Sequence, residues 1–398
     1  MAHADNGVLR IIFPSCRLMS NLSVCHIGFN FFPGQGLTIF YEFARHQARQ
    51  GLGVFAIAPG RPDEPAFEIK DGVRIHRVPL RSIGRFSLDR LWFLIQASRI
   101  LRKNDFDLIH VYAFVGAGLL PWLAGRHRAR WLYDCQTSAI KPPLLWLQNV
   151  LIRAESWSYD VITVLSEGIR DIVFGPRAAV EAIVPLGADF DHFRPQTAQT
   201  YLFEKLGISP DAQVLTYCGT LDHNRHMDRL ISAFALTNAH APDAVLLMIG
   251  DGSALEELKR QARDLNLASR VVFTGYIPYS DIPAYLSITT IALAFVVMDP
   301  RFQHQPPTKT IEYLAQGLPV IATNTTGNRM FIQDKVNGLL CGDSYEDYGH
   351  AMLSLLHNPG QQVCLAACAR DSVSGFDWRN IVRMRVIPLY EDILREKR

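Results

Sequence analysis

Short apolar runs rich in valine and isoleucine alternate with amphipathic helical patterns from Ser23 onward. This alternation is typical of parallel sheets that are covered by helices on both faces, so it predicts an α/β fold. The strand-like runs of the first series are Val24–Gly28, Gly53–Ala58, Val73–Val78, Leu108–Val111, Trp131–Asp134 and Val161–Val164.

A second series of the same kind follows Ile183–Pro195, a segment whose Pro, Gly and Asp residues are typical of a linker. A chain of 398 residues is also too long for one core of ordinary size. Both series open with a strand, a glycine-bearing turn and a helix, and open α/β sheets bind ligands at the carboxyl ends of their strands. We therefore expect two facing, Rossmann-like doubly wound domains with a cleft between them. The expected parts are an N-terminal extension (1–22), two domains (23–190 and 191–375), and a C-terminal helix (376–398) packing back across the junction.

The composition excludes some classes of partner. A formal charge of +2 is too small to indicate nucleic acid binding. The seven cysteines form no metal-ligand spacing, and their odd number favours reduced thiols in the cytoplasm. No run reaches the roughly 20 apolar residues that a spanning helix needs. The stretch Pro142–Ile152, followed by Arg153, suits either a membrane interface at the cytoplasmic face or packing against the adjacent domain.

One long run, PPTKTIEYLAQGLPVIATNTTGNRMFIQDKVNGLL at Pro306–Leu340, resembles the signature of family 4 of the retaining glycosyltransferases, which have the GT-B fold. Further matches follow in the family's order over about residues 23–394, including PGQG, VITVLSEGI, VPLGADFDHF, IGDGS and VVFTGYIP. The resemblance implies transfer of a hexose-type sugar from a nucleoside-diphosphate sugar to an acceptor hydroxyl, with retention and without a cofactor. Saccharides and lipid-linked saccharides in polysaccharide or glycolipid assembly are the acceptors it implies.

The stretch Thr308–Gln316 supports that assignment on physical grounds. Pro306 and Pro307 end any upstream helix, and Thr308 is suited to cap a new one. A helix starting there directs free N–H groups at an anion. Lys309 adds a positive charge for a pyrophosphate, and Glu312, one turn later, can accept two bonds from ribose hydroxyls. In the family this glutamate contacts the ribose. The alternative is a solvated ion pair of little energetic value.

The first turn of the second domain supplies the other expected cation. The family turn G-x-L-x-x-x-(Lys/Arg) implies that Arg225 binds the donor diphosphate with Gly219, and a guanidinium can contact two phosphate oxygens at once. Many members carry an arginine after this glycine, whereas this chain has Thr220. The other residues that the resemblance places around the donor are Gly34, Gly36, Gly250, Tyr276, Ile277, Thr308 and Thr310.

Two positions depart from the family pattern near the transferred sugar. His304 stands eight residues before Glu312, where a second glutamate is usual, and Gln136 replaces the customary histidine of the first domain. These departures keep two alternatives open, a nucleotide-sugar epimerase and a catalytically impaired nucleotide-sugar-binding protein. Two D-x-D matches, at Asp105–Asp107 and Asp189–Asp191, lie before a strand and in the linker. We expect no metal ion, with the diphosphate charge neutralised by Arg225, Lys309 and the helix dipole.

Overall fold

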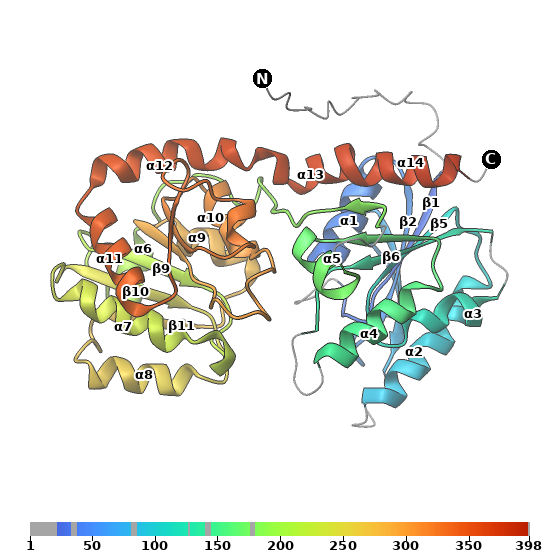
Figure 1. Cartoon of the computed structure of the whole chain (residues 1–398), viewed down its shortest axis with the longest axis horizontal. Helices are drawn as coiled ribbons and strands as arrows, with labels where there is room; N and C mark the ends of the chain where they lie inside the picture. The colour runs from blue at the N-terminus through green and yellow to red at the C-terminus, as the bar shows by residue number, and fades with distance from the viewer. Residues whose placement is uncertain are drawn as a thin grey trace, which may run out of the picture. The chain divides into compact units, whose positions relative to one another are not determined.

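The computed structural model describes residues 22–32, 38–80, 86–125, 128–139, 145–175 and 180–396, with only the backbone described at 86 and 87 (Figure 1). The chain forms two compact units. The first comprises Met1–Tyr133, Ser158–Val161 and Val382–Arg398, and the second comprises Asp134–Trp157 and Ile162–Ile381. The expected α/β class with two doubly wound sheets is confirmed.

The first sheet has eight strands in the order β3-β4-β2-β1-β5-β6-β7-β8. β1 lies inside the sheet and pairs in parallel with both β2 and β5, so the chain winds outward in two directions. β3 pairs with β4 in antiparallel fashion, and this exposed edge strand was not expected from the sequence. The strands are β1 (Ser23–Ile27), β2 (Gly53–Gly60), β3 (Phe67–Lys70), β4 (Val73–Pro79), β5 (Leu108–Tyr112), β6 (Arg130–Cys135), β7 (Val161–Val164) and β8 (Ala182–Ile183).

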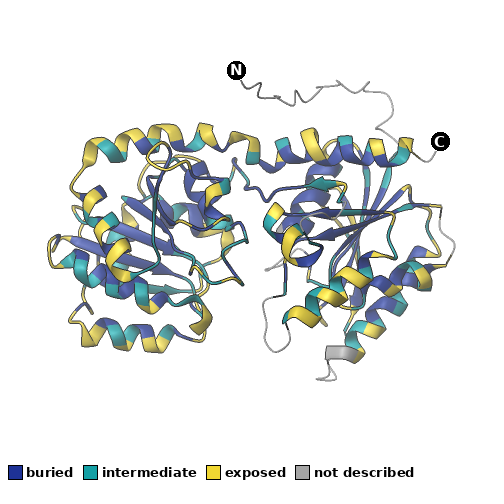
Figure 2. Ribbon diagram, viewed as in Figure 1, coloured by how far each residue is buried: buried dark blue, intermediate teal, exposed yellow. Residues whose placement is uncertain are grey.

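Helices cover both faces of this sheet, with α1 on one side and α2 and α3 on the other (Figure 1). Their inner faces are buried and their outer faces exposed, which explains the amphipathic patterns of the sequence (Figure 2). The first five α-helices of the chain are α1 (Thr38–Arg49), α2 (Phe86–Leu101), α3 (Leu120–Ala124), α4 (Leu145–Ser156) and α5 (Glu167–Val173). The last two of these helices belong to the second unit.

The second sheet has six strands in the order β11-β10-β9-β12-β13-β14, paired in parallel. α7 and α8 lie on one side of it, and α9, α10 and α12 on the other (Figure 1). Its strands are β9 (Gln213–Cys218), β10 (Ala244–Ile249), β11 (Val271–Gly275), β12 (Ile291–Ala294), β13 (Val320–Thr323) and β14 (Leu339–Cys341). Its helices are α6 (Tyr201–Leu206), α7 (Met227–Asn238), α8 (Leu255–Asp264), α9 (Ile282–Leu286), α10 (Thr308–Ala315), α11 (Tyr345–Leu356) and α12 (Pro359–Ser372).

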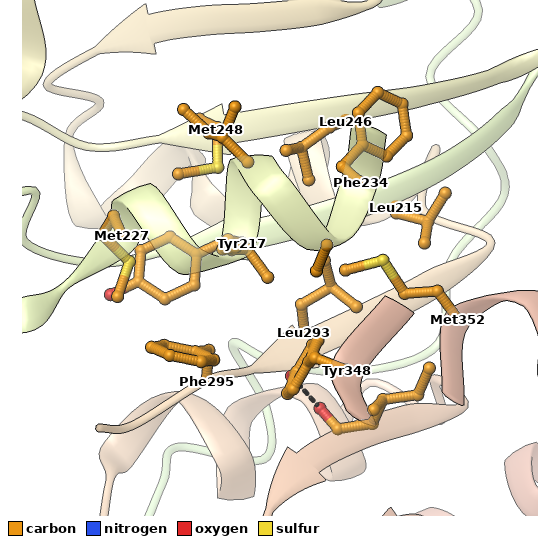
Figure 3. Close-up of a cluster of buried hydrophobic side chains, with 14 of the residues drawn as sticks. Leu215, Tyr217, Met227, Phe234, Leu246, Met248, Leu293, Phe295, Tyr348 and Met352 are labelled. Carbon is orange, nitrogen blue, oxygen red and sulfur yellow. Dashed lines mark hydrogen bonds between the residues drawn. The ribbon is translucent and has the colours of Figure 1, made fainter. Parts of the chain in front are cut away.

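One apolar cluster fills the space between this sheet and α7, α8 and α11 (Figure 3). It includes Tyr217 of β9 and Phe302, two rings that reappear below at the site. The buried hydroxyl of Tyr348 is satisfied by a 2.8 Å hydrogen bond to the Ile321 carbonyl oxygen. Because side chains in such a core are closely packed, any group that rests on these rings has a fixed position.

The chain ends in α13 (Trp378–Ile381), a π-helical turn (Val382–Val386) and α14 (Ile387–Arg395). α14 belongs to the first unit, where its Tyr390 hydroxyl accepts a 3.2 Å hydrogen bond from Gln47 and lies within hydrogen-bonding distance of His110 Nδ1. Gln47 Oε1 is in turn 2.9 Å from Nε2 of His26, which is fully buried. Burial and the neighbouring His110 lower the pKa of His26 to about 3, so this ring stays neutral in the folded protein.

Replacing Tyr390 by phenylalanine should therefore destabilise the first unit. The change keeps the ring but leaves buried groups of Gln47 and His110 without this partner, which costs about 1–3 kcal/mol. Thermal unfolding followed by circular dichroism should show a lower midpoint for Tyr390→Phe. The matched control is Tyr201→Phe, because Tyr201 is 56% exposed. Equal midpoints for Tyr390→Phe and the wild type would contradict the role assigned to this network.

Candidate functional site

Two glycine turns pack against each other at the carboxyl ends of β9 and β10. The Gly219 amide donates to the Ile249 carbonyl at 2.9 Å, and the Leu221 amide donates to the Asp251 carbonyl at 2.9 Å. Gly250 has a φ of 141°, and a Cβ added there would lie 1.9 Å from the Gly219 carbonyl oxygen. Only glycine fits such a contact, so the spacing of the two turns depends on Gly250.

Arg225 lies at the end of a short 3-10 turn, His223–Arg225, that follows the first glycine turn. Its guanidinium carbon is 4.3 Å from the centroid of the Phe302 ring, in the geometry of a cation–π contact. The turn is fastened by Asp222, whose Oδ1 accepts from the backbone amide of Ser253 at 2.9 Å and from its hydroxyl at 3.0 Å. The backbone hydrogen bond is the main reason that the pKa of Asp222 is lowered.

Lys309 reaches the same region from α10. Its Nζ is 3.7 Å from the centroid of the Tyr217 ring, and Tyr217 is 2% exposed. A Cβ added at Gly219 would come within 2.9 Å of this nitrogen, so the glycine leaves room for the ammonium. Burial lowers the pKa of Lys309 to about 7, and repulsion by Arg225 contributes in the same direction. The structure therefore brings the two predicted cations close enough to repel each other, with each cation over an aromatic ring.

Glu312 is 8% exposed, so it is not the solvated surface partner of the alternative interpretation. Its Oε1 accepts a 3.1 Å hydrogen bond from the hydroxyl of Tyr279. The next residue, Tyr313, is fully buried and its hydroxyl accepts a 2.7 Å bond from the amide of Cys218. α10 is thus attached directly to the end of β9, beside the first glycine turn.

The start of α10 differs in one detail from the expectation. The helix begins at Thr308, but Pro307 occupies the N-cap position and no side chain caps the helix, so the predicted capping by Thr308 is wrong. A proline N-cap offers no side-chain acceptor, which leaves the first amides to other partners. Thr310 is fully buried and its hydroxyl bonds to Oδ1 of Asn328 at 2.8 Å. Asn328 Nδ2 donates to the Thr323 carbonyl at 2.8 Å, which ties α10 to β13.

The remaining predicted residues are distributed as follows. Thr220 is exposed beside the first turn, and the Gly250 amide donates to the Gly275 carbonyl at 3.0 Å, which brings the exposed Tyr276 and partly buried Ile277 next to the second turn. Gln136 follows β6 in the first sheet and donates to Asp134, and its Oε1 has no partner among the described residues. His304 is half-buried, with an Nδ1 that bonds to none of the described groups. Gly34 and Gly36 lie outside the described residues.

Both D-x-D matches have structural contacts. Asp107 Oδ2 accepts from the Ser23 amide at 2.8 Å. Asp189 Oδ1 accepts from the amides of Asp191 and His192, at 3.0 and 3.1 Å, which closes a turn in the linker. In the parts of the chain that the structure describes, no group of three or more histidine, cysteine, aspartate or glutamate side chains could hold a metal ion. These contacts give Asp107 and Asp189 structural roles.

Three aromatic residues of the site were missed by the sequence analysis. Tyr217 and Phe302 carry the two cations, and Tyr279 holds Glu312. Each lies close in sequence to a predicted site residue. Tyr217 is two residues before Gly219, Tyr279 is three after Tyr276, and Phe302 is two before His304. That proximity is the only signal, because strand and loop positions of this kind are aromatic for many reasons.

Comparison with known proteins shows the family of the chain. The family model of glycosyl transferases group 1 matches residues 199–371, and that of the glycosyl transferase 4-like domain matches residues 36–187. The alpha-monoglucosyldiacylglycerol synthase of Streptococcus pneumoniae is 26% identical over 78% of this chain and 73% of its own length. A GDP-mannose-dependent alpha-(1-6)-phosphatidylinositol monomannoside mannosyltransferase of Mycolicibacterium smegmatis is 28% identical over 71% of this chain and 75% of its own.

The fold is also that of solved glycosyltransferase structures. Sucrose-phosphate synthase from Thermosynechococcus elongatus superposes with a TM-score of 0.76 and 18% identity, over 94% of this chain and 100% of that one. Both matching family models describe glycosyltransferases, which does not favour the epimerase alternative. The two models together span most of the chain, so the protein belongs to the family 4 glycosyltransferases of the GT-B fold.

Proposed function

We propose that this glycosyltransferase takes a hexose-type sugar from a nucleoside-diphosphate sugar and transfers it, with retention, to an acceptor hydroxyl in polysaccharide or glycolipid assembly. One observation carries the proposal. Two cations, Arg225 and Lys309, rest on buried aromatic rings, and Lys309 lies one helical turn before the buried carboxylate of Glu312 on α10. Opposite charges one turn apart suit a diphosphate and a ribose, because the phosphates are anionic and the ribose offers two vicinal donors.

The residues of the second unit suggest how the leaving group is stabilised. As the bond between the sugar and the phosphate oxygen breaks, negative charge accumulates on the diphosphate, and both cations stabilise it. Burial has already desolvated Lys309 before the donor binds. Retention then follows from attack of the acceptor oxygen on the same face, while its proton passes to the departing phosphate oxygen. No carboxylate nucleophile or metal ion takes part in this proposal, in which Gln136 and His304 face the sugar. We expect turnover to persist in EDTA.

The same proposal includes a lipid-borne acceptor and contact with the cytoplasmic face of a membrane. The two curated relatives are named for glycosylating diacylglycerol and phosphatidylinositol lipids. α4 presents Trp146 and Val150, which are 66% and 51% exposed, at a spacing that puts them on one helical face. Trp157, which is 79% exposed, directly follows the helix. Arg153 is exposed on that face and forms no ion pair with the described residues. Tryptophan with arginine suits a lipid headgroup layer, because the rings enter the interface and the guanidinium meets phosphate.

No helix in the described ranges is long and apolar enough to span the membrane.

The first expected outcome concerns Glu312. Glu312→Gln should weaken binding of the nucleoside-diphosphate sugar and slow turnover, because a neutral amide loses charge-assisted bonds to the ribose worth about 1.5–3 kcal/mol. Donor affinity by calorimetry and turnover in EDTA test this, with Glu256→Gln, an exposed glutamate on α8, as the matched control. If a folded Glu312→Gln enzyme keeps wild-type affinity and rate, the donor assignment fails.

The second concerns the pH dependence of donor binding. The pKa of Lys309 is about 7 in the protein without donor, and a bound diphosphate raises it. Donor affinity should therefore be constant below about pH 7 and fall above that pH, by at most tenfold per pH unit. The proton taken up on binding is measurable by calorimetry at pH 8 in buffers of different ionisation enthalpy. Lys309→Met should bind more weakly, with a flat profile between about pH 6.5 and 8.5. A flat profile in the wild type would show that Lys309 does not meet the diphosphate.

The third concerns α4. A Trp146→Ser/Trp157→Ser variant should bind vesicles of phosphatidylcholine and phosphatidylglycerol at least about tenfold more weakly than the wild type in flotation assays, because two large exposed aromatic groups are lost. Val363→Ser, which alters a residue 68% exposed on α12, is the control and should bind like the wild type. Equal binding by all three proteins would show that α4 does not contribute to membrane binding.

A further inference from the structure

Three anchors connect the segment Asp189–Gln196, which comprises the end of the linker and the residue after it, to α10, the helix that carries Lys309 and Glu312. The first is Arg370 of α12, which donates to the Phe190 carbonyl at 2.9 Å, to the Phe193 carbonyl at 2.7 Å and also to the Ala315 carbonyl at the end of α10. One guanidinium therefore holds both segments. All of these residues belong to the second unit.

The second anchor is the carbonyl oxygen of Pro283 in α9. It accepts a 2.8 Å bond from Nε2 of Gln196 in the linker and another of 2.8 Å from Nε2 of Gln316, the residue that ends α10. A single acceptor thus receives one donor from each segment. With Arg370, it fixes the carboxyl end of α10 relative to the linker.

The third anchor, Tyr279, touches the functional end of α10. His192 of the linker is stacked on its ring, with centroids 5.1 Å apart and an interplanar angle of 28°, and Phe193 packs edge-on at 5.4 Å. His192 Nε2 also lies 2.9 Å from the Tyr279 carbonyl oxygen. On the other side, the Tyr279 hydroxyl donates to Glu312 Oε1 at 3.1 Å. The path from linker to donor carboxylate therefore passes through one side chain.

We propose that Tyr279 is a positioning residue that fixes the Glu312 carboxylate for the donor ribose and makes its orientation depend on the linker through His192. This inference rests on the proposed role of Glu312 in donor binding. A carboxylate that must accept two bonds from ribose loses affinity when it rotates, and the hydrogen bond from the Tyr279 hydroxyl to Oε1 restricts that rotation. The stacked imidazole limits rotation of the Tyr279 ring. A change of linker conformation that unstacks His192 would thus reach the donor site without any contact to the donor.

A double-mutant cycle tests the first part. Tyr279→Phe keeps the ring and its stacking, and should raise the dissociation constant of the donor about threefold to tenfold, with a larger effect on KM than on kcat. In the Glu312→Gln background the same change should have little further effect, because Tyr279 acts through Glu312. Tyr285→Phe is the matched control, since its hydroxyl bonds to Lys205 at 2.9 Å instead. A Tyr279→Phe effect that is absent, or equal in both backgrounds, overturns the proposal.

A second cycle tests the dependence on the linker. His192→Ala should weaken donor binding in the wild type but hardly in Tyr279→Phe, and His192→Phe, which restores a stacked ring, should recover part of the loss. Thermal midpoints within about 2 °C of the wild type would separate positioning from unfolding. If Glu312→Gln impairs donor binding while His192→Ala does not, the linker coupling is wrong and the proposed function stands. If Glu312→Gln itself has no effect, the proposed function fails first.

Discussion

The proposed donor site depends on one desolvated contact, the ammonium of Lys309 over the ring of Tyr217, with 3.7 Å between the nitrogen and the ring centroid. A lysine in this position has lost much of its hydration, which is why its pKa falls to about 7. In the free protein this is an energetic cost that the ring only partly offsets. An incoming diphosphate removes that cost by supplying the missing counter-charge. The site is therefore organised for an anion before the anion arrives.

The position of this contact is set by the core of the second unit. Tyr217, labelled in Figure 3, and Phe302 belong to the same apolar cluster. The two cations rest on the rings of these residues. The glycine turns after β9 and β10 leave room above the rings, since a side chain at Gly219 would approach Lys309 and one at Gly250 would approach Gly219. The packed rings of the cluster fix the position of the two cations, and the glycines leave space for them. Because Lys309 is desolvated there, its attraction to an anion is stronger than it would be in water.

Much of this arrangement was predictable from residue patterns. Alternating strand and helix patterns predicted both doubly wound sheets, because parallel strands buried on both faces need continuous apolar runs. The Pro306-Pro307 pair and the following turn placed Lys309 and Glu312 on one face of a helix, and the structure agrees. The β3 strand was missed because it lies on an exposed edge, where Phe67–Lys70 carries no buried pattern.

The contacts between segments far apart in sequence could not be predicted. Phe302 under Arg225 and Tyr279 on Glu312 join residues that are 77 and 33 positions apart. No periodicity indicates which ring will face which charge, because that choice is made when the helices pack on the sheet. The prediction that Thr308 caps α10 was wrong by one residue. The helix accepts Pro307 at its N-cap, so Thr308 falls inside the first turn.

Hydrogen–deuterium exchange with and without a nucleoside diphosphate tests the central claim most directly, because it reports where the ligand binds without requiring an acceptor. UDP, GDP and ADP would each be compared with the free protein. The account predicts that the nucleotide which binds slows exchange of backbone amides in the turn around Gly219–Arg225, in the turn after Gly250 and in the first turn of α10. Protection confined to the first sheet, or a saturating nucleotide that leaves all three segments unprotected, would contradict it.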